Sequence, residues 1–166
     1  MTRGRASRSR LLAAMTLAAM TLAAMTLAAW TVACGAPGPR AVVLNEDQCG
    51  YCRMEVTDAR FAAEAITRTG RITVFDSVEC LAGYARGADP ATLDALWVTD
   101  AEQSGKFVKV DDAGFLIASE LRGPMGRTVA FASPAAARAA QSTFGGTVAS
   151  WRDVLADTAS GHAGQH

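Results

Sequence analysis

The sequence is poor in histidine, and both of its histidines, His162 and His166, lie in a glycine-rich C-terminal segment. General acid–base catalysis therefore lacks its most common side chain. The sequence also contains no serine–histidine–aspartate set and no glycine-rich phosphate-binding loop. These absences argue against the common classes of enzyme.

Acidic residues are absent before Glu46. Four arginines near the start precede an uncharged run over residues 11–33, which ends in Thr31-Val32-Ala33 directly before Cys34. A basic start, an apolar run and small residues at the end are the layout of a secretory signal. Because the end resembles the site at which bacterial lipoproteins are lipidated, we predict a lipoprotein-type signal peptide over residues 1–33 and lipidation of Cys34.

An uncleaved transmembrane anchor is the alternative interpretation, because the apolar run is long enough to cross a bilayer. Both interpretations place the rest of the chain in the cell envelope, facing the periplasm or another extracytoplasmic space. Residues 34–46, which include Pro37 and Pro39, are expected to form a tether. We assign residues 47–155 to one folded domain and residues 156–166 to a flexible tail.

Basic runs are absent from residues 34–166, which contain 12 basic and 16 acidic residues and carry a net charge of about −4. Nucleic acid is therefore not an expected partner. The remaining length suits a single domain.

Hydrophobic patterning predicts a mixed fold. We expect strands within residues 56–69 and over 72–75, a helix after Asp76-Ser77 with Glu79 at capping-box spacing, and a short helix at Asp89-Pro90. A strand near residues 97–99, a hairpin of residues 106–110 and 115–118, a helix from Ser133 to Phe144 and a last strand over residues 147–151 follow.

Two stretches of the sequence resemble each other. Residues 70–77 align without gaps to residues 126–133, with identical Gly, Arg, Phe and Ser at a constant offset. Each stretch is predicted to be a strand that leads into a helix and another strand. We therefore expect an α+β fold of two related ββαβ units in one compact domain.

The segment from Cys49 to Met54 contains the most chemistry, with two thiols in a Cys-x-x-Cys spacing and a thioether two residues after Cys52. Thiolate and thioether sulfurs are soft ligands that select Cu(I) over hard cations. Met125 lies between Gly123-Pro124 and Gly126, outside any apolar periodic run, and is a further candidate ligand. Sulfurs from these two loops would form a low-coordinate Cu(I) site.

The order of short motifs resembles the NosL family, whose members are lipoprotein accessory proteins of nitrous oxide reductase. The motifs are Cys52-x-Met54, Phe75-Asp76, Val98-x-Asp100, Met125-Gly126 with Ala130-Phe131, and Gly145-Gly146-x-Val148. The resemblance implies a metallochaperone without enzymatic activity that binds Cu(I) through Cys52, Met54 and Met125. It implies delivery of copper to an envelope copper enzyme, typically nitrous oxide reductase, and a possible copper transporter as a partner.

Several alternatives stay open for the cysteines. Cys49 could be a further ligand, or could form a disulfide or redox pair with Cys52 in the oxidising envelope. A thiol–disulfide oxidoreductase would need an apolar strand before the motif, and the residues there are polar. Cys80 is expected to be a small core residue, so that a four-ligand zinc site lacks a second cysteine pair.

Overall fold

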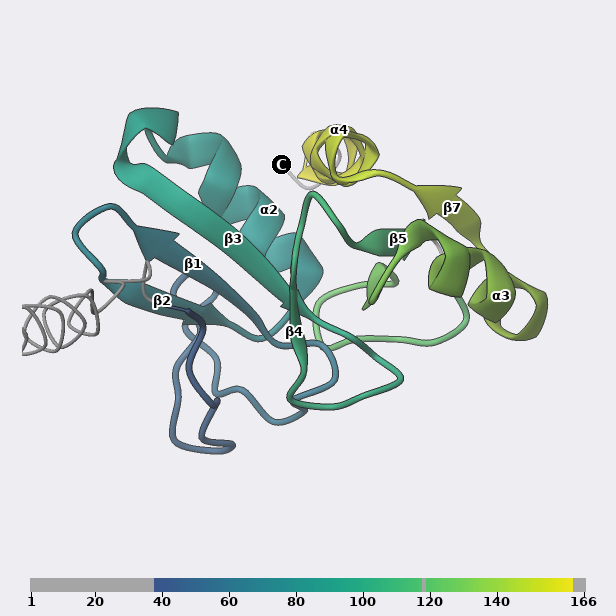
Figure 1. The fold of residues 1–166 in the computed structure, drawn as a ribbon, viewed down its shortest axis with the longest axis horizontal. Helices are drawn as coiled ribbons and strands as arrows, with labels where there is room; N and C mark the ends of the chain where they lie inside the picture. Colours follow the sequence, from purple (N-terminus) through teal and green to yellow (C-terminus); the bar gives the residue numbers. More distant parts are fainter. Residues whose placement is uncertain (1–37, 118, 163–166) are drawn as a thin grey trace, which may run out of the picture. The chain divides into compact units, whose positions relative to one another are not determined.

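A computed structural model describes residues 38–117 and 119–162 of the chain (Figure 1). The predicted leader, Cys34 and His166 lie outside these residues. The described residues form two antiparallel sheets and three α-helices, as expected for an α+β fold. Among them, no helix has both the length and the apolar character needed to cross a membrane.

The first sheet has the strand order β2-β1-β3-β4. Its strands are β1 (Ala63–Thr67), β2 (Ile72–Phe75), β3 (Leu93–Thr99) and β4 (Phe107–Lys109). Helix α2 (Val78–Gly87) connects β2 to β3 and is followed by the short 3-10 helix η2 (Pro90–Thr92), which Asp89 caps as predicted. The helix packs on the sheet face that contains Ala63 and Ala65.

The second sheet repeats this arrangement. Strands β5 (Gly114–Ile117), β6 (Val129–Phe131) and β7 (Thr147–Ala149) have the order β6-β5-β7, and helix α3 (Pro134–Phe144) connects β6 to β7. Phe75 pairs with the first residue of β1, and Phe131 pairs with the first residue of β5. Ser77 and Ser133 both cap the helix that follows. The topology therefore confirms two ββαβ units.

The predicted hairpin of residues 106–110 and 115–118 is wrong, because β4 pairs with β3 and β5 pairs with β6 and β7. The backbone N–H groups of Asp112 and Ala113 both donate to the carbonyl of Lys109, at 3.0 Å each. This tight turn directs the chain out of the first sheet and into the second. The two strands thus flank a turn, as expected, without pairing across it.

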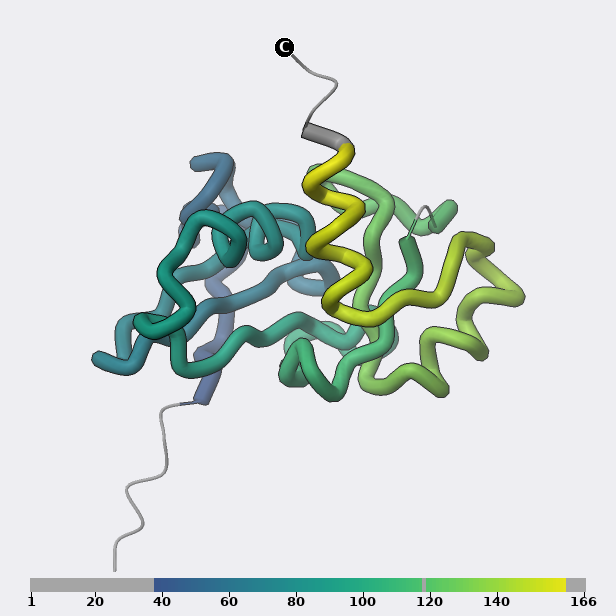
Figure 2. The backbone as a smooth tube through the Cα atoms, turned by 90° about the horizontal axis from the view of Figure 1, so that it is seen from above, coloured from purple at the N-terminus to yellow at the C-terminus, as the bar shows by residue number. Residues whose placement is uncertain are grey.

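The C-terminal segment also differs from the prediction, because helix α4 (Trp151–His162) replaces both the end of the last strand and the first part of the tail. Ser150 Oγ and Asp153 Oδ2 lie 2.6 Å apart, and the backbone N–H of Ser150 donates to the same carboxylate at 2.8 Å. The backbone N–H of Asp153 donates in return to Ser150 Oγ at 3.4 Å, and this reciprocal cap begins the helix. Val154 is fully buried, and α4 packs beside α2 (Figures 1 and 2).

The two units share one hydrophobic core. Its largest cluster joins Phe75 and Leu81 of the first unit to Phe115 of the second and to Val154 of α4. Burial of such side chains contributes about 1.5–3 kcal/mol each. This burial therefore fixes the positions of β2 and α2 relative to each other.

A buried carboxylate lies on the other side of the first sheet. Glu64 in β1 is completely buried, and its Oε2 accepts the backbone N–H of Arg40 at 3.1 Å. Its Oε1 has no hydrogen-bond partner among the described residues. Burial raises the pKa of Glu64 to about 7, because the charged form is poorly solvated.

We expect Glu64 to make the stability of the domain depend on pH. The unfolded chain loses this proton near pH 4.5, whereas the folded chain keeps it to about pH 7. Since the folded state binds more protons between these values, the free energy of unfolding falls as the pH rises through this window. Urea unfolding of Glu64→Gln at pH 5 and pH 7.5 should lack this loss, which we expect to be about 1–3 kcal/mol in the unchanged chain. Parallel pH profiles for the two proteins would contradict this account.

Candidate metal site

Three thiols and one carboxylate converge at one end of the first sheet. The Sγ atoms of Cys49, Cys52 and Cys80 and a carboxylate oxygen of Asp76 all lie within 4.8 Å of one another. Cys49, Asp76 and Cys80 are buried, whereas Cys52 is half-buried. The three cysteines are free thiols in this structure. We call these four residues the thiol cluster.

A tight turn provides the first two thiols. The backbone N–H of Cys49 donates to the carbonyl of Met54 at 2.8 Å, and the N–H of Arg53 donates to the carbonyl of Cys49 at 3.1 Å. Arg53 closes the turn in the left-handed region with φ at 69°, a costly conformation for a residue with a Cβ. The turn directs the thiols of Cys49 and Cys52 inward and leaves Tyr51 and Met54 exposed.

This turn is docked on both β2 and α2. The backbone N–H of Gly50 donates to the carbonyl of Val74 in β2 at 2.8 Å. The ring of Tyr51 lies against Gly83 of α2, where an added Cβ would come within 2.6 Å of the ring. A larger residue at position 83 would therefore push the turn away from the helix.

The other two members of the thiol cluster lie where β2 passes into α2. Asp76 follows the last residue of β2, and Ser77 is the helix cap, because its Oγ accepts the backbone N–H of Cys80 at 3.1 Å. Cys80 is thus in the first turn of the helix, where the macrodipole favours negative charge. The predicted capping box with Asp76 is wrong, since Asp76 turns into the thiol cluster and Glu79 bonds a different loop.

The environment of the thiols separates their pKa values. Hydrogen bonds from Cys80 and from the backbone of Asp76, Cys52 and Tyr51 lower the pKa of Cys49 to about 4. The bond with Cys49 and then burial raise the pKa of Cys80, while burial raises the pKa of Cys52. The buried pair of Cys49 and Cys80 therefore favours one shared thiolate, with the hydrogen bonds to Cys49 lowering the pKa of that thiol.

Asp76 differs from an ordinary surface carboxylate. Burial raises its pKa, and its Oδ1 lies 3.6 Å from Cys52 Sγ. Its Oδ2 is buried and has no hydrogen-bond partner among the described residues. An unpaired buried oxygen beside three thiols is a donor that a metal ion could use.

The structure brings together only some of the residues that the sequence analysis proposed as ligands. Cys49 and Cys52 belong to the thiol cluster, whereas Met54 and Met125 are exposed and lie outside it. Cys80 is buried in the core as expected, but its sulfur also joins the thiol cluster. No spacing in the sequence connects Cys80 to the Cys-x-x-Cys pair, because the contact arises from the packing of α2 on the sheet.

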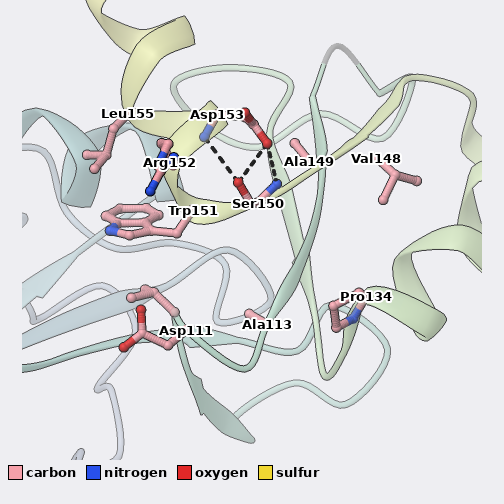
Figure 3. A pocket seen from close by; sticks show the side chains of 11 residues that line it. Asp111, Ala113, Pro134, Val148, Ala149, Ser150, Trp151, Arg152, Asp153 and Leu155 are labelled. Atoms are coloured by element: carbon pink, nitrogen blue, oxygen red, sulfur yellow. Dashed lines mark hydrogen bonds between the residues drawn. The ribbon is translucent and has the colours of Figure 1, made fainter.

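A separate pocket contains no sulfur. It has a volume of about 780 Å³ and lies where α4 begins, lined by Trp151, Arg152, Asp153 and the loop that contains Asp111 (Figure 3). Its hydrogen bonds join Ser150 to Asp153 and belong to the helix cap. Metal chemistry in the described part of the chain is therefore concentrated at the thiol cluster.

The fold and the site define a small α+β domain with a sulfur-rich candidate metal site. A family model described as NosL matches residues 40–159, and the chain belongs to the NosL family.

Two solved structures are similar to this chain. The crystal structure of the copper chaperone NosL from Shewanella denitrificans shares 22% identity, with a TM-score of 0.57 over 70% of this chain and 96% of that one. The solution NMR structure of apo-NosL from Achromobacter cycloclastes shares 26% identity, with a TM-score of 0.41 over 55% of this chain and 82% of that one. The first likeness concerns the fold. No curated protein matches the sequence.

We expect Gly83→Ala to loosen the docking of the turn while the domain stays folded. Cys49 is completely buried, so an alkylating reagent reaches it only when the turn opens. Overpacking against Tyr51 should lower the cost of opening by about 1–2 kcal/mol. Mass spectrometry should therefore show alkylation of Cys49 accelerated by roughly 5–30-fold.

Gly87→Ala is the matched control, because an added Cβ at Gly87 of the same helix meets nothing within 4 Å. It should leave alkylation of Cys49 unchanged and favour the helix slightly. Equal alkylation rates in the two variants would show that Tyr51 does not dock the turn.

Proposed function

We propose that this protein is a Cu(I) chaperone that binds one copper ion at the thiol cluster and passes it to a copper enzyme of the cell envelope. The observation that carries the proposal is the convergence of three thiols within 4.8 Å of one another. Thiolate sulfur is a soft ligand that suits Cu(I). The description of the Shewanella denitrificans relative as a copper chaperone supports the same function.

The gradient of exposure across the site suits a carrier. Cys49 and Cys80 are buried and would retain the ion, whereas Cys52 is half-buried and Met54 is 48% exposed. An incoming protein ligand could reach the ion from the side of Cys52 and Met54 without unfolding the core. We propose that Cys49, Cys52 and Cys80 are the main ligands, with the thioethers of Met54 and Met125 on the exchange side.

The proposed partners follow from the family and from the leader. Nitrous oxide reductase is the acceptor that the NosL resemblance implies, and a membrane copper transporter would serve as the donor. Lipidation of Cys34 would hold the domain at the envelope membrane, within reach of both. Copper is cargo in this proposal, and the protein catalyses no reaction of its own.

Binding of Cu(I) should depend strongly on the cysteines of the turn. The reduced full-length chain, kept in detergent because of its apolar leader, should bind one equivalent of Cu(I) in anaerobic competition with a chromophoric chelator. Cys49→Ser and Cys52→Ser should each weaken this binding by roughly 100-fold or more, since each replaces a soft ligand with a hard one. Cys34→Ser is the matched control and should bind as the unchanged chain does.

Failure of the folded, fully reduced chain to bind Cu(I) would overturn the proposal. The Cys49–Cys52 pair would then be better explained as a redox pair. Equal Cu(I) affinities for Cys49→Ser, Cys52→Ser and the control Cys34→Ser would also contradict the assignment of the site.

Asp76 allows Cu(I) to be distinguished from Zn(II). Three thiolates and a carboxylate form a four-donor set that Zn(II) could adopt, whereas Cu(I) needs only the sulfurs. Asp76→Asn keeps the shape and removes the charge. We expect it to weaken Zn(II) binding by about 10–100-fold and to change Cu(I) affinity by less than about threefold. Equal losses for both metals would make Asp76 a copper ligand, contrary to this account.

A further inference from the structure

The side chain of Glu79 fastens the loop that contains Met125 to the first turn of α2. Glu79 Oε1 accepts the backbone N–H of Thr128 at 2.8 Å, across 49 positions of the sequence. In the sequence, Glu79 directly precedes Cys80, which belongs to the thiol cluster. The bond therefore joins the loop to the helix turn that supplies the third thiol.

A glycine allows this close approach. An ideal Cβ at Gly126 would collide with the carboxylate of Glu79, so the backbone of the loop lies directly on that side chain. The N–H of Gly123 donates to the carbonyl of Gly126 at 3.0 Å, which closes a four-residue turn around Met125. Met125 directly precedes Gly126, and the backbone of Gly126 lies against the side chain of Glu79.

Hydrophobic packing does not fix the position of Met125, because its side chain is 45% exposed. The backbone contacts of its loop must therefore determine where the thioether lies. One end of the loop is tied by Arg127, whose Nε donates to the carbonyl of Ser119 at 2.9 Å. The bond between Glu79 and Thr128 ties the same end to α2.

The second carboxylate oxygen of Glu79 lowers the stability of the fold. Its Oε2 is buried and has no hydrogen-bond partner among the described residues. A buried carboxylate oxygen without a partner is unfavourable for stability. The position is thus better explained by what Glu79 holds in place than by its contribution to folding.

We propose that Glu79 is a positioning residue that holds the Met125 loop against the first turn of α2, so that the Met125 thioether can reach Cu(I) held by the cysteines. This inference rests on the proposed function, because it concerns how one of the proposed ligands is placed. Glu79 itself does not bind the metal in this scheme.

Two measurements on the reduced full-length chain test the inference. The first is amide hydrogen exchange at Thr128 in the metal-free protein. Glu79→Ala removes the acceptor and should raise this exchange by roughly tenfold, whereas Glu79→Gln keeps an acceptor oxygen and should restore protection. This readout does not depend on copper.

The second measurement is Cu(I) affinity in a double-mutant cycle. Met125→Leu nearly keeps the volume and removes the sulfur, and we expect it to weaken binding by roughly tenfold. Glu79→Ala should weaken binding by a similar factor, and Glu79→Gln should not. The double variant Glu79→Ala/Met125→Leu should bind no more weakly than Met125→Leu alone, because both changes remove the same interaction.

The outcomes separate the inference from the proposed function. If Cu(I) binding depends on Met125 but not on Glu79, or if the two losses add, the positioning role is wrong and the copper site stands. If the chain binds no Cu(I), the proposed function fails. Amide hydrogen exchange at Thr128 would then show only that Glu79 holds the loop in place. Rescue by glutamine in both measurements would establish the positioning role.

Discussion

The docking of one turn on β2 and α2 determines whether the four members of the thiol cluster come together. Residues 49–52 carry two of the thiols, and α2 carries the third. They meet because Gly50 bonds the carbonyl of Val74 and because Gly83 leaves room for the ring of Tyr51. Both contacts rest on β2 and α2, which the shared core holds in place. If the turn were to detach, Cys49 and Cys52 would become an ordinary surface pair.

The same docking gives the three thiols different chemical characters. Cys49 is buried and accepts hydrogen bonds, which lower its pKa, whereas burial raises the pKa of Cys52 at the edge of the site. A thiolate is thus prepared at the inner position, and a more exchangeable thiol faces the surface. In the proposed function, the exposed thioethers of Met54 and Met125 would extend the sulfur donors outward. In this arrangement, retention and release of a soft metal ion would depend on different residues of one site.

Much of the fold could be predicted from the sequence, because its determinants are local. The matching stretches at residues 70–77 and 126–133 indicated two ββαβ units, and the serines at 77 and 133 indicated where each helix begins. Helix α4 was missed although its cap, Ser150 with Asp153, is also a local signal. The hairpin prediction failed because strand pairing here depends on tertiary packing. Strands β4 and β5 belong to different sheets, which no local pattern in the sequence indicates.

The site could be predicted only in its local part. Cys49 and Cys52 are close in sequence, and their thiols indicate a soft metal ion, whereas Met54, predicted with them, lies outside the thiol cluster. Cys80 and Asp76 join them through the crossover from β2 to α2, for which the sequence offers no spacing signal.

X-ray absorption at the copper edge of the Cu(I)-loaded chain tests the central claim most directly, because it reports the atoms bound to the metal. We expect a first shell of sulfur alone, in which the number of sulfurs falls when Cys80 is replaced by serine. A first shell that contains nitrogen or oxygen, or one that is unchanged in Cys80→Ser, would contradict the claim that the three cysteines of the thiol cluster hold copper through sulfur alone.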